Sequence, residues 1–267
     1  MASRRRLQIE RKKVNPMIDP MDSLVLGPVE LPSEEEMKAS ATKRWDMAAH
    51  VTIDQWPEEI TALSVPSILI PIDTDEMKNI YDPESPNWAS AMDKYSKLID
   101  EAIGWEPHFI RLSTRSPKDS AYPGLPITLS GKQAMDWISH SERCMDDLWM
   151  AYMAGKPIFI ALRKLYRAPP GGEFRCFAKD GKLIAVSRYD YHQEAQINYK
   201  GWEIFKQLSD WYDEKIAMHY PTVVFDVELG AYDHEGPLLI EVNPYGLSHP
   251  CLFEGYDDIE NNGGFRA

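Results

Sequence analysis

Short apolar runs separated by turn-forming residues dominate the pattern of this chain. Runs of this length with flanking Pro and Gly are typical of buried strands. The predicted strands are Ser64–Ile72, His108–Leu112, Ile158–Leu165, Phe174–Ala178 and Leu183–Tyr189. Lys179–Lys182 contains Asp-Gly, a composition that favours a tight hairpin turn between the last two strands.

Two longer segments show the periodicity of amphipathic helices. In Gly131–Ala154 the apolar side chains recur mostly at three- and four-residue steps, and Ser130 precedes it as a candidate N-cap. Ile197–Met218 predicts a second long helix. Strands combined with these two helices predict an α+β fold with a mostly antiparallel sheet in the second half of the chain.

A second hairpin carries polar side chains at its strand ends. Val223–Phe225 precedes Asp226, and Leu238–Ile240 precedes Glu241, with a turn-rich segment between the two runs. Because side chains alternate along a strand, Glu241 and Asn243 face the same side, and the neighbouring strand can bring Asp226 to it.

Two carboxylates and an amide oxygen form a hard donor set that suits Mg2+ or Mn2+, with water and nucleotide phosphates as further ligands. Asp226, Glu241 and Asn243 are therefore candidate metal ligands. Pro244 and Gly246 predict that the strand ends directly after them, at a sheet rim. The alternative is that Asp226 and Glu241 are ordinary acids at strand ends beside a turn.

Several charged residues interrupt the predicted strands. They are Arg163, Lys164, Glu173, Arg175 and Arg188. Because an unpaired buried charge is costly, each needs an anion, an acid partner or solvent. A triphosphate supplies such an anion close to the candidate metal ligands. The alternative for each residue is a position at a sheet edge, where the aliphatic stem reaches water.

Composition narrows the class of protein. The chain has 267 residues, 43% of them hydrophobic, which is enough for a sizeable core. A net charge of -13 argues against a surface built as a whole to hold nucleic acid, although a local basic groove remains possible. The three cysteines show no CxxC spacing, and no apolar run has the length of a membrane span. We expect a cytoplasmic protein without membrane contact.

The combination of segments resembles a known family. ALRKLYRAPPGGEFRCFAKDGKLIAVSRYDY, followed by VVFDVEL and LLIEVNPYG, is similar to the nucleotide-binding half of ATP-grasp proteins, and most similar to the cell division cycle protein 123 family. The similarity continues in IRLSTRSPKDS, ISHSERCMDDL and CLFEGYDD. The resemblance implies an ATP-grasp fold of two lobes with covering helices, and it covers roughly 109–258.

The resemblance also implies residue roles. Asp226, Glu241 and Asn243 are implied to hold Mg2+ (or Mn2+) on ATP. The backbone of Arg163, Lys164 and Leu165 is implied to meet adenine, while Glu173 and Arg175 line the nucleotide cleft and Arg188 reaches phosphate.

Two further cations belong to the implied phosphate site. Arg111 stands where the family usually has a phosphate-contacting lysine, and Lys118 follows in SPKD. Arg binds phosphate bidentately but is not a rotating point charge, so this departure leaves binding intact while the chemistry can differ. Glu241 replaces the Asp that the family commonly has on the last strand, a conservative change that favours a working enzyme.

The expected division is a tail at 1–50, partly mobile and basic at Arg4–Lys13, an N-terminal lobe at 51–155, and a C-terminal lobe at 156–260 with the nucleotide and metal site. The function expected first is an ATP- and Mg-dependent ligase or phosphotransferase with an unidentified acceptor. The alternatives are an ATP-binding assembly factor with a translation-factor partner, and an ATP-grasp ligase acting on RNA ends.

The RNA-end alternative raises the question of a lysine nucleophile. Lys179, Asp180 and Gly181 are similar to the lysine-x-Asp-Gly motif of adenylate-forming ligases, but the spacing is one residue short. We interpret these residues as a hairpin turn.

Overall fold

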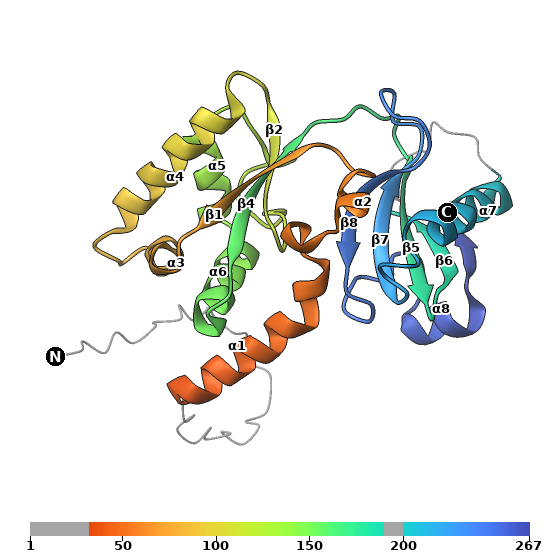
Figure 1. The fold of residues 1–267 in the computed structure, drawn as a ribbon, viewed down its shortest axis with the longest axis horizontal. Coiled ribbons are helices and arrows are strands. Elements are labelled where there is room, and N and C mark those ends of the chain that lie inside the picture. The colour runs from red at the N-terminus through yellow and green to blue at the C-terminus, as the bar shows by residue number, and fades with distance from the viewer. Residues whose placement is uncertain (1–31, 190–199) are drawn as a thin grey trace, which may run out of the picture. The chain divides into compact units, whose positions relative to one another are not determined.

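The computed structural model describes residues 32–189 and 200–267, and Glu34–Ala267 form one compact unit. Its helices are α1 (Glu34–Ala48), α2 (Glu58–Thr61), α3 (Thr74–Tyr81), α4 (Trp88–Ile103), α5 (Gly131–Ser139), α6 (Glu142–Ala154), α7 (Gly201–Lys215) and α8 (Tyr256–Asn262), with short 3-10 turns η1 (Ala49–Val51) and η2 (Ile53–Gln55). Its strands form two separate sheets (Figure 1).

The first sheet has the order β1-β4-β2-β3 and is antiparallel. Its strands are β1 (Ser67–Ile72), β4 (Ile158–Lys164), β2 (His108–Leu112) and β3 (Ile127–Thr128). Alternate side chains such as Ile110, Leu112 and Ile160 form one core with α3, α4, α5 and α6. Figure 1 shows these helices gathered on one side of the sheet. The other face, which carries Arg111 and Arg163, is left for contacts with the second sheet.

The second sheet has the order β8-β7-β5-β6-β9. Its strands are β8 (Leu238–Asn243), β7 (Val223–Glu228), β5 (Glu173–Lys179), β6 (Lys182–Arg188) and β9 (Gly264–Arg266); only the β6–β9 pairing among them is parallel. Phe174 and Phe225 pack under α7 on one face. Phe177 and Val224 pack with Ile259 of α8 at one end of the opposite face, and the other end of that face carries polar side chains.

The α+β class and the mostly antiparallel second half are confirmed, and each predicted strand is present within a few residues of its expected bounds. The turn between β5 and β6 places Asp180 and Gly181 at φ of 52° and 74°. Two consecutive positive φ values are the geometry of the tight hairpin predicted from Asp-Gly. Lys179 forms an ion pair with Glu260 at 2.7 Å.

The helix predictions need a correction. Gly131–Ala154 is two helices, because the chain leaves helical geometry at His140 and restarts where the Ser141 side chain accepts from the Cys144 amide. The second predicted helix is present as α7; residues 197–199 of that prediction lie outside the described residues.

The N-terminal part of the chain and β4 also differ from expectation. Within the segment predicted as a tail, α1 buries Ala41 and Trp45, and it packs beside α6. The basic run Arg4–Lys13 lies outside the described residues. The strand expected to open the C-terminal lobe, β4, is instead the second strand of the first sheet, because it pairs with β1 and β2 on its two edges.

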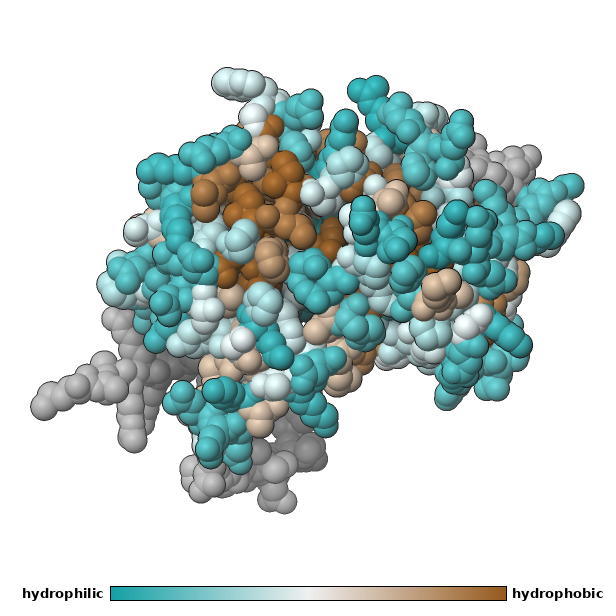
Figure 2. Space-filling view, in the orientation of Figure 1, coloured by the Kyte–Doolittle hydropathy of each residue, from teal (hydrophilic) through white to brown (hydrophobic). Residues whose placement is uncertain are grey.

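Hydrophobic residues gather on the face drawn in Figure 2 where Figure 1 places β1, β4 and β2. Ile68 of the edge strand β1 is 41% exposed. No helix within residues 32–189 and 200–267 has the length and apolar character needed to cross a membrane.

Candidate functional site

The register of the second sheet brings the predicted polar residues onto one face. Asp226 is the cross-strand partner of Glu241 on one side and of Arg175 on the other. Directly opposed residues share a face of a sheet. We call this surface the site face, and its polar members are Glu173, Arg175, Asp226, Glu228, Glu241 and Asn243. Val242 lies in the core on the opposite face, as the alternation predicts.

Arg175 and Asp226 form a buried bidentate pair. Arg175 Nε donates to Asp226 Oδ1 and its Nη2 donates to Oδ2, both at 2.8 Å. The two residues are 5% and 1% exposed. Burial alone would lower the pKa of Arg175, but the facing Asp226 carboxylate raises it above its usual value. Burial raises the pKa of Asp226 and the Arg175 guanidinium opposes that rise, so each charge depends on its partner, in the geometry that Arg and carboxylate prefer.

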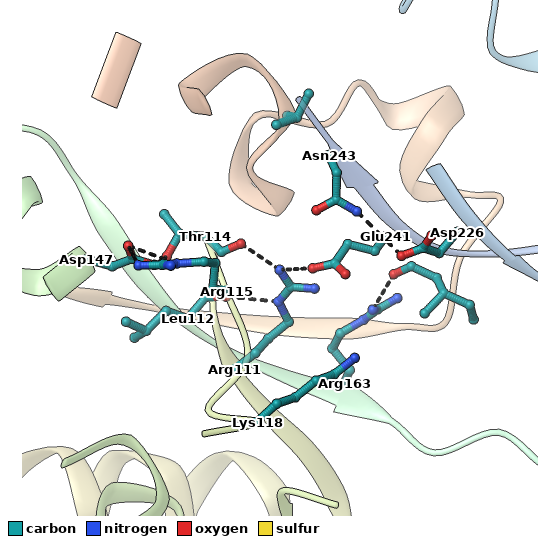
Figure 3. Close-up of polar contacts among 12 residues, drawn as sticks. Arg111, Leu112, Thr114, Arg115, Lys118, Asp147, Arg163, Asp226, Glu241 and Asn243 are labelled. Carbon is teal, nitrogen blue, oxygen red and sulfur yellow. Dashed lines mark hydrogen bonds and ion pairs between the residues drawn. The ribbon is translucent and has the colours of Figure 1, made fainter. Parts of the chain in front are cut away.

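Arg111 reaches across from the first sheet to Glu241. Its Nη2 lies 2.8 Å from Glu241 Oε1, while the same guanidinium donates to the carbonyls of Leu112 and Thr114 (Figure 3). Burial would raise the pKa of Glu241, but the surrounding cations, Arg111 first, lower it to about 2. Glu241 is therefore ionised at neutral pH and faces the first sheet.

Arg163 makes a second link between the sheets. Its Nη2 donates to Ser64 Oγ at 2.6 Å, and its Nη1 donates to the carbonyl of Ile240 on β8. Burial and the neighbouring Arg111 lower the pKa of Arg163 to about 10. Its Nε is buried and has no hydrogen-bond partner among the residues that the structure describes. An anion beside this guanidinium would give its unpaired donor an acceptor.

Lys118 stands at the open side of the site and contacts Tyr189. Its Nζ lies 5.2 Å from the centre of the Tyr189 ring, and Arg175 Cζ lies 4.6 Å from the same ring. Tyr189 thus orders two cations of the site. Tyr189 is not among the site residues predicted from the sequence, where it ends the predicted strand Leu183–Tyr189.

The loop that carries Lys118 is fixed to α6. Arg115 forms an ion pair with the buried Asp147, Nη2 to Oδ1 at 2.6 Å, and Thr114 Oγ1 donates to Asp147 Oδ2 at 2.6 Å. Ser141 at the start of α6 donates to Asp119 on the other side of Lys118. Both ends of the segment Thr114–Asp119 are therefore anchored, which limits where Lys118 can reach.

A pair of acids lies on the site face beside these cations. Glu173 and Glu228 are direct cross-strand partners, and Oε1 of Glu228 is buried with no hydrogen-bond partner in the described part of the chain. Burial first, and then Asp226, raises the pKa of Glu173 to about 7, while burial and Glu173 raise that of Glu228 to about 8. Glu228 is not among the residues predicted for the site, although its two-residue spacing from Asp226 places it on the same face.

Three predicted site residues are not brought into this cluster by their side chains. Lys164 pairs with His108 and shares the helix-covered face of the first sheet, opposite to Arg163. Arg188 pairs with Phe174, whose side chain packs under α7, so Arg188 lies on the face away from Asp226. Leu165 follows β4 and is half-buried. A backbone contact of Lys164 and Leu165 with adenine stays a prediction.

Comparison with known proteins identifies the family. A family model described as D123 matches residues 71–264. The chain belongs to the D123 family. The resemblance to cell division cycle protein 123 noted from the sequence is thereby confirmed.

Relatives of this D123 chain are named after a translation initiation factor. A "Translation initiation factor eIF2 assembly protein" of Xenopus tropicalis is 26% identical over 208 residues, covering 71% of this chain and 59% of the relative. A protein of the same name from Xenopus laevis is 34% identical over 107 residues, covering 39% of this chain and 31% of the relative. The chain thus spans less than two thirds of the length of these relatives.

A solved structure shows the same fold. C-terminally truncated Cdc123 from Schizosaccharomyces pombe superposes with a TM-score of 0.62 at 21% identity, covering 82% of this chain and 95% of that one.

The donors of the predicted metal site in this D123 chain fit a hard cation. Each Asp226 oxygen accepts one bond from Arg175, and Oδ1 keeps a further lone pair. Asn243 Nδ2 lies 3.5 Å from Asp226 Oδ2, which leaves the Asn243 carbonyl oxygen available, and Figure 3 shows Glu241 and Asn243 side by side. Within residues 32–189 and 200–267 no group of three or more His, Cys, Asp or Glu residues could hold a metal, so a metal here would depend on the Asn243 amide.

The charges around Glu241 determine what this arrangement can bind. Four cations, Arg111, Lys118, Arg175 and Arg163, act on the Glu241 carboxylate, and two acids, Asp226 and Glu173, lie near it. This excess of positive charge opposes a free metal ion and attracts a polyanion. A metal that arrives with a polyphosphate satisfies both the carboxylates and the guanidinium groups.

Proposed function

We propose that this D123 chain binds ATP together with Mg2+ between its two sheets, in the manner that its resemblance to ATP-grasp proteins implies. The observation that carries the proposal is the facing of Arg111 and Arg163 on the first sheet against Asp226, Glu241 and Asn243 on the second. Oxygen ligands beside guanidinium groups form a combination suited to a metal-bound polyphosphate.

Each side chain of the site has a role in this proposal. Asp226, Glu241 and Asn243 would hold the metal, and Mn2+ would serve with the same donors. Arg111, Lys118 and Arg175 would contact phosphate oxygens, with Arg111 released from Glu241 as the nucleotide enters. Arg163 would keep β4 attached to β8 and add positive charge behind the phosphates.

The reaction that fits this site is an ATP-dependent ligation or phosphoryl transfer. Bound Mg2+ would neutralise charge on the phosphates. The chain's own contribution would be to hold the phosphates with guanidinium groups that are already fixed by carbonyls and carboxylates, so that little reorganisation is needed. Tyr189 would restrict Lys118 and Arg175 to one side of the phosphates.

The second candidate is an ATP-binding assembly factor. It is favoured by the names of the Xenopus relatives, which describe assembly of a translation initiation factor. The same site would then bind nucleotide to fix the relation of the two sheets, and the partner would be a translation factor. The hypothesis of RNA-end ligation gains no specific support from residues 32–189 and 200–267, where Lys179 forms an ion pair with Glu260 on a hairpin turn.

One experiment separates these functions. The purified chain is incubated with Mg-ATP, and nucleotide binding and the release of ADP or AMP are measured with and without candidate acceptors. We expect saturable binding that Arg111→Met weakens at least tenfold (about 1.4 kcal/mol). The matched control is Lys132→Met, on the exposed surface of α5. Release of ADP would support the enzyme, whereas binding without turnover would support the assembly factor. Absence of ATP binding would refute both.

A further inference from the structure

A cavity of about 530 Å3 opens beside the metal ligands. At one end it is lined by Lys118, Arg175, Glu241 and Asn243, the residues assigned above to phosphate and metal. From there it extends to the end of α1 and the start of α6, where Arg44 and Arg143 line it. The proposed function gives the residues at this second end no role in holding the nucleotide, which leaves space for another molecule.

The two arginines at this end are free to bind an anion. Within the described residues neither guanidinium forms an ion pair, unlike Arg115 between them, which is held by Asp147. Asp119 is the acid nearby, but its carboxylate already accepts from the Ser141 hydroxyl and the Arg143 amide. The cavity wall as a whole carries five Lys or Arg and two Asp or Glu residues, in a chain with a net charge of -13.

Apolar side chains stand among polar ones on the rest of the wall. Val51 and Met150 lie in its buried part, and the exposed side chains Met47 and Leu247, 47% and 60% exposed, stand on it as well. Basic side chains that only face solvent do not require apolar side chains beside them. An acceptor that joins an anionic group to an apolar body would cover these side chains while its charge reaches the guanidinium groups.

The flanking charges limit the acceptor to a compact anion. Asp46 follows Arg44 on α1, and Glu142 and Asp146 flank Arg143 on α6; all three are exposed. A polyanion such as RNA would bring further phosphates against these acids. A single carboxylate would not, and it matches a planar guanidinium bidentately.

We propose that this cavity is the acceptor site and that it takes a carboxylate attached to an apolar body, such as the C-terminal end of an apolar peptide, with Arg44 and Arg143 binding the carboxylate. The assignment as acceptor site rests on the proposed function of the adjoining metal and phosphate residues. The recognition of the carboxylate rests only on the cavity and its charges.

The test uses N-acetyl-Leu-Leu with a free carboxylate as the probe, titrated into the full chain with and without a non-hydrolysable ATP analogue and Mg2+. We expect saturable binding of the probe, at least tenfold weaker binding of its C-terminal amide, and at least tenfold weaker probe binding by the variant Arg44→Gln/Arg143→Gln. Affinity for the ATP analogue should stay within twofold of wild type.

The matched control is Lys43→Gln/Lys132→Gln, which removes two positive charges from α1 and α5 at positions that do not line this cavity. It should bind the probe as wild type does. No probe binding, equal binding of the amide, or an equal loss in the control would overturn the proposal. The proposal would also be overturned if a 5′-phosphorylated RNA oligonucleotide bound through Arg44 and Arg143 while the probe did not bind. Failure of the ATP analogue alone, with the probe still bound, would refute the nucleotide site and leave carboxylate recognition standing.

Discussion

Asp226 and Arg175 depend on each other for their charged state. Both are buried and joined by two hydrogen bonds, while Arg175 also donates to the His249 carbonyl. The sequence places Asp226 at a sheet rim, which suggests that its removal would leave the fold largely intact. The structure corrects that expectation, since the partner would be left as a buried unpaired cation.

Asp226→Ala should therefore destabilise the chain by about 3–5 kcal/mol, the typical cost of removing one partner of a buried pair. Urea unfolding measures this loss. The double variant Arg175→Met/Asp226→Leu should recover a large part of it, because no unpaired charge remains. A single variant as stable as wild type would show that the pair is not buried as described.

Glu173 gives a pH dependence to stability. Its pKa is raised to about 7, so the folded state binds its proton more tightly than the unfolded state, whose carboxyl titrates near 4.5. As pH rises from about 4.5 to 7, the unfolded state releases this proton first, and the folded state loses stability. Above pH 7 the full cost of the buried charge is present.

Glu173→Gln, which stays neutral, should become more stable than wild type over this range, by on the order of 1 kcal/mol or more at pH 7 and by little at pH 4.5. Urea unfolding of the nucleotide-free chain at several pH values measures the difference. Glu101→Gln, on the exposed surface of α4, is the control and should show a constant offset. A constant offset for Glu173→Gln as well would argue against a buried, uncompensated carboxyl.

The segment Thr114–Asp119 shows how an element without regular structure is held in place. Asp147 on α6 binds both Arg115 and Thr114, and it is itself buried. Because Lys118 lies in the same segment, the position of a proposed phosphate ligand depends on a helix that does not contact phosphate.

Asp147→Asn should destabilise the chain by about 1–3 kcal/mol through loss of the charge-assisted bonds. It should also speed hydrogen exchange at the amides of Ser116 and Lys118 more than elsewhere in the first sheet. Asp146→Asn, an exposed neighbour on the same helix, provides the comparison and should leave both quantities near wild type. Unchanged exchange in Asp147→Asn would mean that other contacts hold the loop.

How far the sequence predicts these elements depends on what their side chains contact. The strands β2, β7 and β8 were predicted because their apolar runs are short and bounded by turns. The helix α1 gave little signal, because only Ala41 and Trp45 are buried along it. In α4 the buried residues Tyr95, Ile99 and Ile103 follow a four-residue spacing that is typical of an amphipathic helix.

The sequence predicts those parts of the site that depend on the alternation of side chains along one strand. It does not predict the parts that depend on pairing between distant strands or sheets. Glu241 and Asn243 share a face by spacing alone. The pairing of Arg175 with Asp226 and of Arg111 with Glu241 depends on strand register and on the approach of two sheets, which no local pattern contains. The position of Arg188 depends on the register of β6 against β5 in the same way.

The net charge of the site distinguishes the binding of Mg2+ alone from the binding of Mg2+ together with ATP. Because cations outnumber acids around Glu241, Mg2+ added alone should bind weakly, with no saturation below about 1 mM, and should bind well once ATP supplies its own negative charge. Calorimetric titrations of Mg2+ with and without ATP distinguish these cases. Tight binding of Mg2+ without nucleotide would contradict the charge balance described here.

The most direct test of the nucleotide site is calorimetric titration of the chain with a non-hydrolysable ATP analogue in the presence of Mg2+, for wild type and for Glu241→Gln. The site described here predicts saturable binding of one nucleotide per chain, with affinity at least tenfold lower in the variant and lower in wild type when EDTA removes the metal. Absence of binding heat in wild type, or identical affinities under all three conditions, would contradict it.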